Sequence, residues 1–206
     1  MLWRFSSIFF WAIAVSLPLL AESEPLQRGA MLAEEECQEC HGKDGRSHEP
    51  SIPSIGGFSE TAILDLLQTY KEEARPAQTI ELEDGTETNM YDVVESLSAE
   101  ELETIANYYA NLDWQPIDQW FDKDMAKQGA RIHGVKCGKC HLREGRIPES
   151  DHAILAGQWR EYLEIQFEDF SNGARRMASK MQQKFDSLSD RDKELLLELY
   201  VSAGQY

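Results

Sequence analysis

The chain has 206 residues, of which 20 are basic and 37 acidic, so its formal net charge at pH 7 is −17. A surface this negative repels phosphate backbones and anionic lipid, so neither nucleic acid nor a membrane surface is an expected partner. The length suits one medium-sized domain or two small ones.

The first 23 residues are typical of a secretory signal peptide. Arg4 precedes an apolar run at residues 8–20, which only Ser16 and Pro18 interrupt, and small residues follow at Ala21 and Ser23. The run is too short to span a bilayer comfortably, so we expect cleavage and export to the periplasm. An uncleaved N-terminal anchor is the alternative. No later segment is apolar enough to cross a membrane, so no span is expected after cleavage.

Residues 24–112 are expected to form a first helical domain. A short helix near Gly29 leads into the stretch EEECQECHGKDGR at 34–46, which holds Cys37, Cys40 and His41. An amphipathic helix and a loop with Met90 follow. A last helix is expected after Ser98, because serine caps helices and acidic residues favour their first turn.

A second unit repeats the first with a period of one hundred. Cys37, Cys40 and His41 recur as Cys137, Cys140 and His141, and the offset becomes 91 after Arg75, so that Met90 corresponds to Met181. We therefore expect a linker at 113–124, where Pro116 ends a helical run, and a second domain at 125–206. Its amphipathic helix is expected in GQWREYLEIQFEDF (157–170) and its last helix after Ser189. Strand-like alternation is almost absent, so the fold is expected to be all-α.

The change of offset marks an insertion of nine residues in the first unit, between Arg75 and Met90. Its acidic part, Glu81 to Glu87, is expected to be a solvated loop. Docking of a basic partner is the alternative for this segment.

Three kinds of site use cysteines at this spacing. A four-cysteine zinc site requires both pairs to converge, and the pairs of known ribbons lie closer in sequence than Cys40 and Cys137. Redox pairs of the thioredoxin type require a βαβ setting, which a helical repeat does not supply. Covalent haem attachment requires two thiols and an adjacent imidazole, and Cys-x-x-Cys-His supplies them twice. We therefore predict two covalently bound haem c groups, which use all four cysteines and leave no disulfide.

The remaining coordination position of each iron is expected to be filled by a methionine. Met90 and Met181 occupy equivalent positions of the repeat, and a thioether raises the reduction potential and closes the iron to other ligands. Met177 is a rival to Met181 but falls outside the repeat register. The other three histidines lack counterparts and are expected at the surface rather than as ligands: His48, His133 and His152.

With these motifs the chain resembles dihaem class I cytochromes c of the c-4 type over essentially its whole length after residue 23. LAGQWREYLEIQFEDFSNGARR (155–176) and LSAEELETIANYYA (97–110) are similar to that family beside the haem motifs. The resemblance implies two tandem class I cytochrome c domains, each wrapped around a haem. It also implies that the first and last helices cross near Gly29/Tyr108 and Gly129/Leu199, with proximal ligands His41 and His141 and distal ligands Met90 and Met181.

Two positions depart from the family pattern in the second unit. Leu142 replaces the glycine present as Gly42, and Ala153 replaces the proline present as Pro53, whose carbonyl orients the haem histidine in the family. Ligation is expected to survive, with an altered environment for the second haem.

The resemblance implies a periplasmic electron carrier rather than an enzyme. Two alternatives remain open. In the first alternative, the chain is the electron-accepting subunit of an oxidoreductase such as a flavocytochrome c sulfide dehydrogenase, with a flavoprotein or cationic redox protein as its partner. An open sixth position would instead indicate a haem peroxidase.

Overall fold

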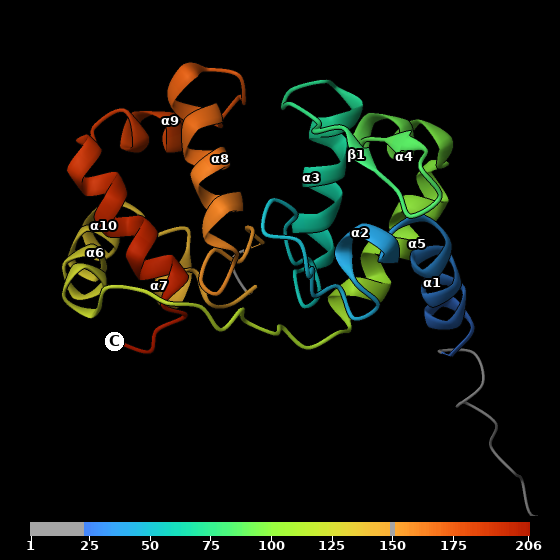
Figure 1. The fold of residues 1–206 in the computed structure, drawn as a ribbon, viewed down its shortest axis with the longest axis horizontal. Helices are drawn as coiled ribbons and strands as arrows, with labels where there is room; N and C mark the ends of the chain where they lie inside the picture. The colour runs from blue at the N-terminus through green and yellow to red at the C-terminus, as the bar shows by residue number, and fades with distance from the viewer. Residues whose placement is uncertain (1–22, 149–150) are drawn as a thin grey trace, which may run out of the picture.

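The protein folds into two groups of helices that lie side by side, with α3 and α8 facing each other between them (Figure 1). A computed structural model describes residues 23–148 and 151–206, so residues 1–22 of the expected signal peptide lie outside the described residues. The first group consists of α1 (Ser23–Glu36), α2 (Gln38–His41), α3 (Glu60–Lys71), β1 (Ile80–Glu81), β2 (Glu87–Thr88), α4 (Met90–Ser96) and α5 (Ala99–Ala110). The second consists of α6 (Lys123–Lys136), α7 (Leu142–Gly145), α8 (Arg160–Asn172), α9 (Ser179–Phe185) and α10 (Asp190–Val201).

The helices reproduce both registers of the sequence repeat. Helices α1 and α6 have the same length and begin 100 residues apart, and α5 and α10 begin 91 residues apart. Ser98 and Ser189 cap α5 and α10 with the same capping box. The serine hydroxyl accepts a bond from the amide of the third helical residue, Glu101 or Asp192, and the carboxylate of that residue accepts one from the serine amide. The expected all-α class and the two tandem helical units are therefore confirmed.

The first and last helices of each unit cross at a glycine. A Cβ on Gly29 would lie 2.7 Å from both the Thr104 carbonyl oxygen and Tyr108 Cβ. A Cβ on Gly129 would lie 2.1 Å from the Leu195 carbonyl oxygen and 3.0 Å from Leu199 Cβ. Only glycine permits such close approach of two helix backbones, which is why this residue recurs in both units.

Each unit has its own apolar core next to this crossing. The first core is built around Tyr109 and Ala106, which are 0 % exposed, and the second around Leu196 and Leu199, which are 1 % exposed. Ile154, from the second unit, packs into the first core. The two units therefore share part of their buried surface.

The insertion of the first unit is a short β-hairpin rather than the loop expected from the sequence. Ile80 pairs with Thr88 and Glu81 with Glu87 in an antiparallel ladder. Asp84 Oδ1 accepts bonds from the amide and hydroxyl of Thr86, which closes the turn. The acidic residues of the hairpin are exposed, as expected for a solvated segment.

The two units are joined by buried hydrogen bonds as well as by the linker. Gln158, 1 % exposed, accepts a bond from the Ser54 amide (3.0 Å) and donates one to the Ser54 carbonyl (2.6 Å). The Trp159 indole donates to the Ser47 carbonyl at 3.2 Å, and the Tyr162 amide donates to the Pro50 carbonyl at 3.0 Å. These bonds fix the loop after the first cysteine motif against the start of α8.

Replacing Gln158 with alanine is expected to destabilise this junction by about 2 kcal/mol, because it leaves a buried amide and a buried carbonyl of Ser54 without partners. Urea unfolding followed by circular dichroism measures the loss. Gln128→Ala is the matched control, because Gln128 is exposed and its amide bonds only the Asp124 carbonyl of its own helix. Equal stability of the two variants would contradict this role of Gln158.

None of the helices between residues 23 and 206 that the structure describes is both long and apolar enough to span a bilayer.

Candidate functional site

The first cysteine motif lies at the junction of α1 and α2. The Cys37 amide continues the hydrogen bonding of α1 by donating to the Ala33 carbonyl, and the His41 amide donates to the Cys37 carbonyl at 2.9 Å. This tight turn brings both thiols and the imidazole to one cavity of about 290 Å³. A smaller adjoining space of about 40 Å³ reaches the buried Tyr109.

Met90, at the start of α4, lines the same cavity. Asn89 caps α4 by accepting bonds from the Tyr91 amide (2.8 Å) and the Asp92 amide (3.3 Å), so that Met90 is the first residue of the helix. The other walls are mainly aliphatic and aromatic side chains from α3, the hairpin, α4 and α8 of the second unit, among them Ile63, Leu67, Tyr70, Ile80, Val93 and Ile165. The structure therefore brings Cys37, Cys40, His41 and Met90 together, although the histidine and the methionine are 49 positions apart in the sequence.

His41 is oriented by a backbone carbonyl. Its Nδ1 lies 2.9 Å from the Pro53 carbonyl oxygen. A carbonyl only accepts hydrogen bonds, so Nδ1 carries the proton and the lone pair of Nε2 is free for a metal. Burial lowers the pKa of His41, which keeps the ring neutral as a ligand requires.

The first site fits a covalently bound haem. Burial raises the pKa of Cys37 to about 11 and also raises the pKa of Cys40, as expected for thiols that face an apolar space. Two thiols, a neutral imidazole and a thioether around an apolar cavity are the donor set of a His/Met c-type haem.

The second motif has the same backbone hydrogen bond at its histidine as the first, and its backbone conformation differs after that residue. The His141 amide donates to the Cys137 carbonyl at 3.0 Å, as in the first unit. Gly42 has φ +76°, and a Cβ there would lie 2.2 Å from the Arg46 carbonyl oxygen. Leu142 cannot adopt this conformation without a clash. In the turn after His141, positive φ angles occur instead at Arg143 (47°) and Glu144 (63°), which precede Gly145. The substitution noted in the sequence thus changes the backbone after His141.

The backbone holds His141 less closely than it holds His41. Within the described part of the chain its buried Nδ1 has no hydrogen-bond partner, although the Ala153 backbone is close enough to affect its pKa. Burial lowers the pKa of His141 to about 4, and the rings of His152 and His133 add to this effect. The ring of His152, an exposed residue, lies edge-on to that of His141 with 5.3 Å between centroids.

Met181 is less enclosed than Met90. It lies inside α9 rather than at its first position, and the residue is 37 % exposed. Met177, the alternative candidate ligand, is half-buried.

Helix α9 is anchored by Phe185, which is buried and packs its ring against Phe167 and Phe170, with centroids 5.9 and 5.7 Å away.

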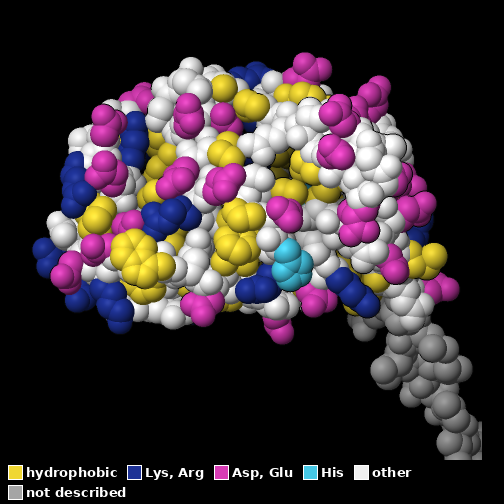
Figure 2. All heavy atoms as spheres, in the orientation of Figure 1, with side chains coloured by type: hydrophobic (Ala, Val, Ile, Leu, Met, Phe, Trp, Pro, Cys, Tyr) yellow, Lys and Arg dark blue, Asp and Glu magenta, His cyan; other side chains and the backbone are white. Residues whose placement is uncertain are grey.

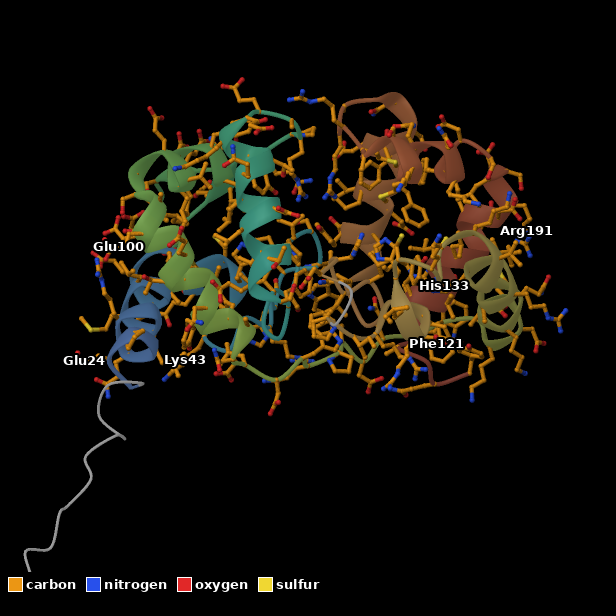
Figure 3. All side chains as sticks on the ribbon, turned by 180° about the vertical axis from the view of Figure 1, so that it is seen from behind. Glu24, Lys43, Glu100, Phe121, His133 and Arg191 are labelled. Atoms are coloured by element: carbon orange, nitrogen blue, oxygen red, sulfur yellow. The ribbon has the colours of Figure 1, made fainter. Side chains whose placement is uncertain are left out.

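The prediction that His133 lies at the surface is wrong. His133 is 2 % exposed and sits between α6 and α10 (Figure 3). Its Nδ1 lies 3.1 Å from the Tyr200 hydroxyl, and its Nε2 lies 2.8 Å from the His141 carbonyl oxygen. Both polar atoms of the ring are therefore satisfied, so burial is permitted. His48 and His152 are exposed, as expected.

His133→Ala is expected to destabilise the second unit by about 2 kcal/mol, because the Tyr200 hydroxyl and the His141 carbonyl lose a buried partner. The first unit has Ala33 at this position, so the backbone accepts alanine. Thermal unfolding of the holoprotein measures the change, with the exposed His48→Ala as control. If both variants unfold at the same temperature, the His133 contacts contribute nothing to stability.

Two arginines at equivalent repeat positions meet between the units. Arg75, 4 % exposed, donates to Gln166 Oε1 at 2.8 Å, and Arg175 donates to the same oxygen. Each guanidinium also lies over an aromatic ring of its own unit, Tyr70 at 4.5 Å and Phe170 at 4.6 Å. Burial and the neighbouring Arg75 lower the pKa of Arg175 to about 10, which reflects the concentration of positive charge.

This arginine pair lies beside the first cavity, which Arg75 and Gln166 both line. Arg75 Nε is buried without a partner among the described residues. A buried, incompletely paired positive charge favours an anion, and haem c carries carboxylate groups. The sequence signal was the recurrence of Ala-Arg at 74–75 and 174–175, whose role the repeat did not reveal.

The four thiols are free of sulfur–sulfur bonds and remain in two separate pairs. Among the described residues no three histidine, cysteine or acidic side chains converge as a zinc site requires.

Comparisons with known proteins agree with this geometry. The Cytochrome c family model matches residues 26–113. The chain is 30 % identical over 148 residues to cytochrome c4 of Stutzerimonas stutzeri, an alignment that covers 68 % of this chain and 69 % of the relative. The crystal structure of reduced recombinant cytochrome c4 from Pseudomonas stutzeri superposes with a TM-score of 0.69 at 27 % identity, over 85 % of this chain and 97 % of that one. A thiosulfate dehydrogenase from Marichromatium purpuratum shares the fold over 86 % of this chain and 40 % of its own, with a TM-score of 0.67 at 19 % identity.

Proposed function

We propose a set of haem-holding residues for this chain, which belongs to the cytochrome c4 family. As a member of that family it is an electron carrier with two haem c groups rather than an enzyme. The observation that carries the proposal is the convergence of Cys37, Cys40, His41 and Met90 on one apolar cavity. When bound, the haem supplies an iron that exchanges one electron at a time.

In the first unit, Cys37 and Cys40 would hold the haem through thioether bonds, and His41 and Met90 would bind its iron. The Pro53 carbonyl holds the His41 ring in the tautomer that presents Nε2. Aliphatic walls exclude water, which favours the ferrous state and raises the reduction potential. Arg75 would balance the haem carboxylates at the junction of the units.

In the second unit, Cys137 and Cys140 would attach the haem, and His141 and Met181 would bind its iron. The repeat register supports this assignment, because each residue lies at the position of a first-unit counterpart. The missing Nδ1 contact of His141 and the exposed Met181 support a different reduction potential for the second haem.

The two haem units would span residues 24–112 and 125–206, with residues 113–124 as the linker. The two apolar cores, the end of α5 at Ala110 and the start of α6 at Lys123 support these limits to within about two residues. We propose that the N-terminal 23 residues direct export to the periplasm, on the strength of their apolar run and small residues alone. The partners would be other redox proteins.

An optically monitored redox titration of the holoprotein tests this function. Two one-electron steps with different potentials and low-spin spectra in both oxidation states are expected. A high-spin ferric spectrum, or binding of carbon monoxide by the ferrous protein, would show an open coordination position and contradict the carrier role. Isolation as a fixed complex with a flavin-bearing chain would instead favour the subunit role.

A further inference from the structure

The two cysteine motifs carry opposite charges at equivalent positions. Glu36 and Glu39 precede the two cysteines of the first motif, and Lys136 and Lys139 precede those of the second. Their burial is also equivalent, because Glu36 and Lys136 are both half-buried and Glu39 and Lys139 are both exposed. The same fold therefore presents a negative rim at one haem attachment site and a positive rim at the other.

The charge of the whole chain is divided in the same way. Residues 24–112 contain 20 acidic and 5 basic side chains, a formal charge of −15, whereas residues 125–206 contain 12 acidic and 13 basic, a formal charge of +1. On the face drawn in Figure 2, lysine and arginine side chains gather over the half built from α6 to α10. The net charge of −17 therefore describes the first unit and the linker but not the second unit.

The second motif is also the less covered of the two. In the first unit the hairpin lies against the motif, where the Glu83 amide donates to Glu39 Oε1 at 2.9 Å, and its Ile80 lines the cavity. The second unit has no such insertion. Beside its motif Val135 is 77 % exposed and Leu142 is 37 % exposed, and Cys140 is itself exposed.

Basic side chains border these apolar groups. Lys136 donates to Ser187 Oγ at 2.9 Å, which brings the loop after α9 to the motif. Ser187 Oγ in turn donates to the Lys184 carbonyl at 2.7 Å, so Lys184 lies on the same side. The second-haem face is defined here as Val135, Lys136, Lys139, Cys140, Leu142 and Lys184. An apolar centre with a charged rim is the usual composition of a transient protein interface.

We propose that the second-haem face docks an acidic redox protein, which exchanges one electron with the haem attached at Cys137 and Cys140. Carboxylates of the partner pair with Lys136, Lys139 and Lys184, and its apolar contact area covers Val135 and Leu142. The strongly negative first unit repels the same partner, so electrostatic steering selects the second unit as its point of entry. The proposal rests on the assignment of the second haem to this motif.

Stopped-flow reduction of the oxidised holoprotein by the hydroquinone form of a flavodoxin, a small acidic flavoprotein, tests the proposal. The flavin loses one electron and one ferric haem gains it. The double variant K136E/K139E is expected to slow the second-order step about tenfold at low ionic strength and by much less at high salt, because screening removes steering. Lys139→Glu alone, at an exposed position, keeps the Lys136 contact to Ser187 and is expected to show a smaller slowing of the same kind.

The matched control is K123E/K127E, which makes the same change of charge at exposed positions in the first turns of the same helix. Equal slowing by both double variants would mean that only net charge matters and would overturn the proposal. An amide-shift map by NMR gives a readout that needs no electron transfer, and it should place flavodoxin at residues 135–142. A map centred on the first unit would also overturn the proposal. The haem content and low-spin spectrum of each variant are measured first, so a failure of the haem assignment is distinguished from a failure of docking.

Discussion

Replacing Gly129 with alanine is expected to lower the free energy of unfolding of the second unit by about 3 kcal/mol. The added Cβ would lie 2.1 Å from the Leu195 carbonyl oxygen and 2.7 Å from its carbon, and neither is the mobile end of a side chain. The α6 and α10 backbones must therefore separate, and the core around Leu196 and Leu199 loosens with them. Urea unfolding followed by circular dichroism measures the effect.

The same helix supplies the control. A Cβ on Gly134 of α6 would meet nothing within 4 Å, so Gly134→Ala adds helix propensity without a clash and should stabilise by up to about 1 kcal/mol. Opposite signs for two glycine-to-alanine changes five residues apart would show that close packing, rather than backbone freedom, explains Gly129. A stabilised Gly129→Ala variant would show that the helices do not cross as described.

The double variant Cys37→Ser/Cys40→Ser is expected to lose one of the two covalent haems and to unfold much of the first unit. The thiols line a cavity of about 290 Å³ between α3, α4 and the hairpin, and a unit of this size depends on the haem to complete its core. The intact mass of the purified chain should fall by one haem, and the remaining spectrum should belong to the second haem.

Cys137→Ser/Cys140→Ser is the reciprocal variant and should retain the first haem alone. A chain that keeps two covalent haems after either change would place the attachment elsewhere. Loss of both haems from either variant would mean that the units cannot mature independently.

The repeat allowed much of the fold to be predicted from the sequence. Ser98 and Ser189 mark the starts of α5 and α10 because local capping chemistry determines where such helices begin. The crossings at Gly29 and Gly129 followed from the family resemblance, and in the structure they reflect the close approach of two backbones. The adjacency of Cys37, Cys40 and His41 in sequence likewise guaranteed their adjacency in space.

Features that depend on contacts between distant residues were not accessible in this way. His133 is buried because Tyr200 and the His141 carbonyl, brought together only by the folded chain, satisfy both of its nitrogens. Gln158 and Ser54 meet across 104 residues, and the arginines at 75 and 175 meet on Gln166 only when the units are docked. The hairpin was missed because its strands are two residues long and give no alternating pattern.

The central claim, that both irons are held by histidine and methionine, is tested most directly by the weak long-wavelength band of ferric haem that reports an iron–methionine bond. The wild-type holoprotein should show this band, Met90→Ala and Met181→Ala should each remove about half of its intensity, and Met177→Ala should leave it unchanged. Loss of half the band in Met177→Ala, with none lost in Met181→Ala, would transfer the second ligand to Met177. Absence of the band from the wild-type protein would contradict His/Met ligation at both haems.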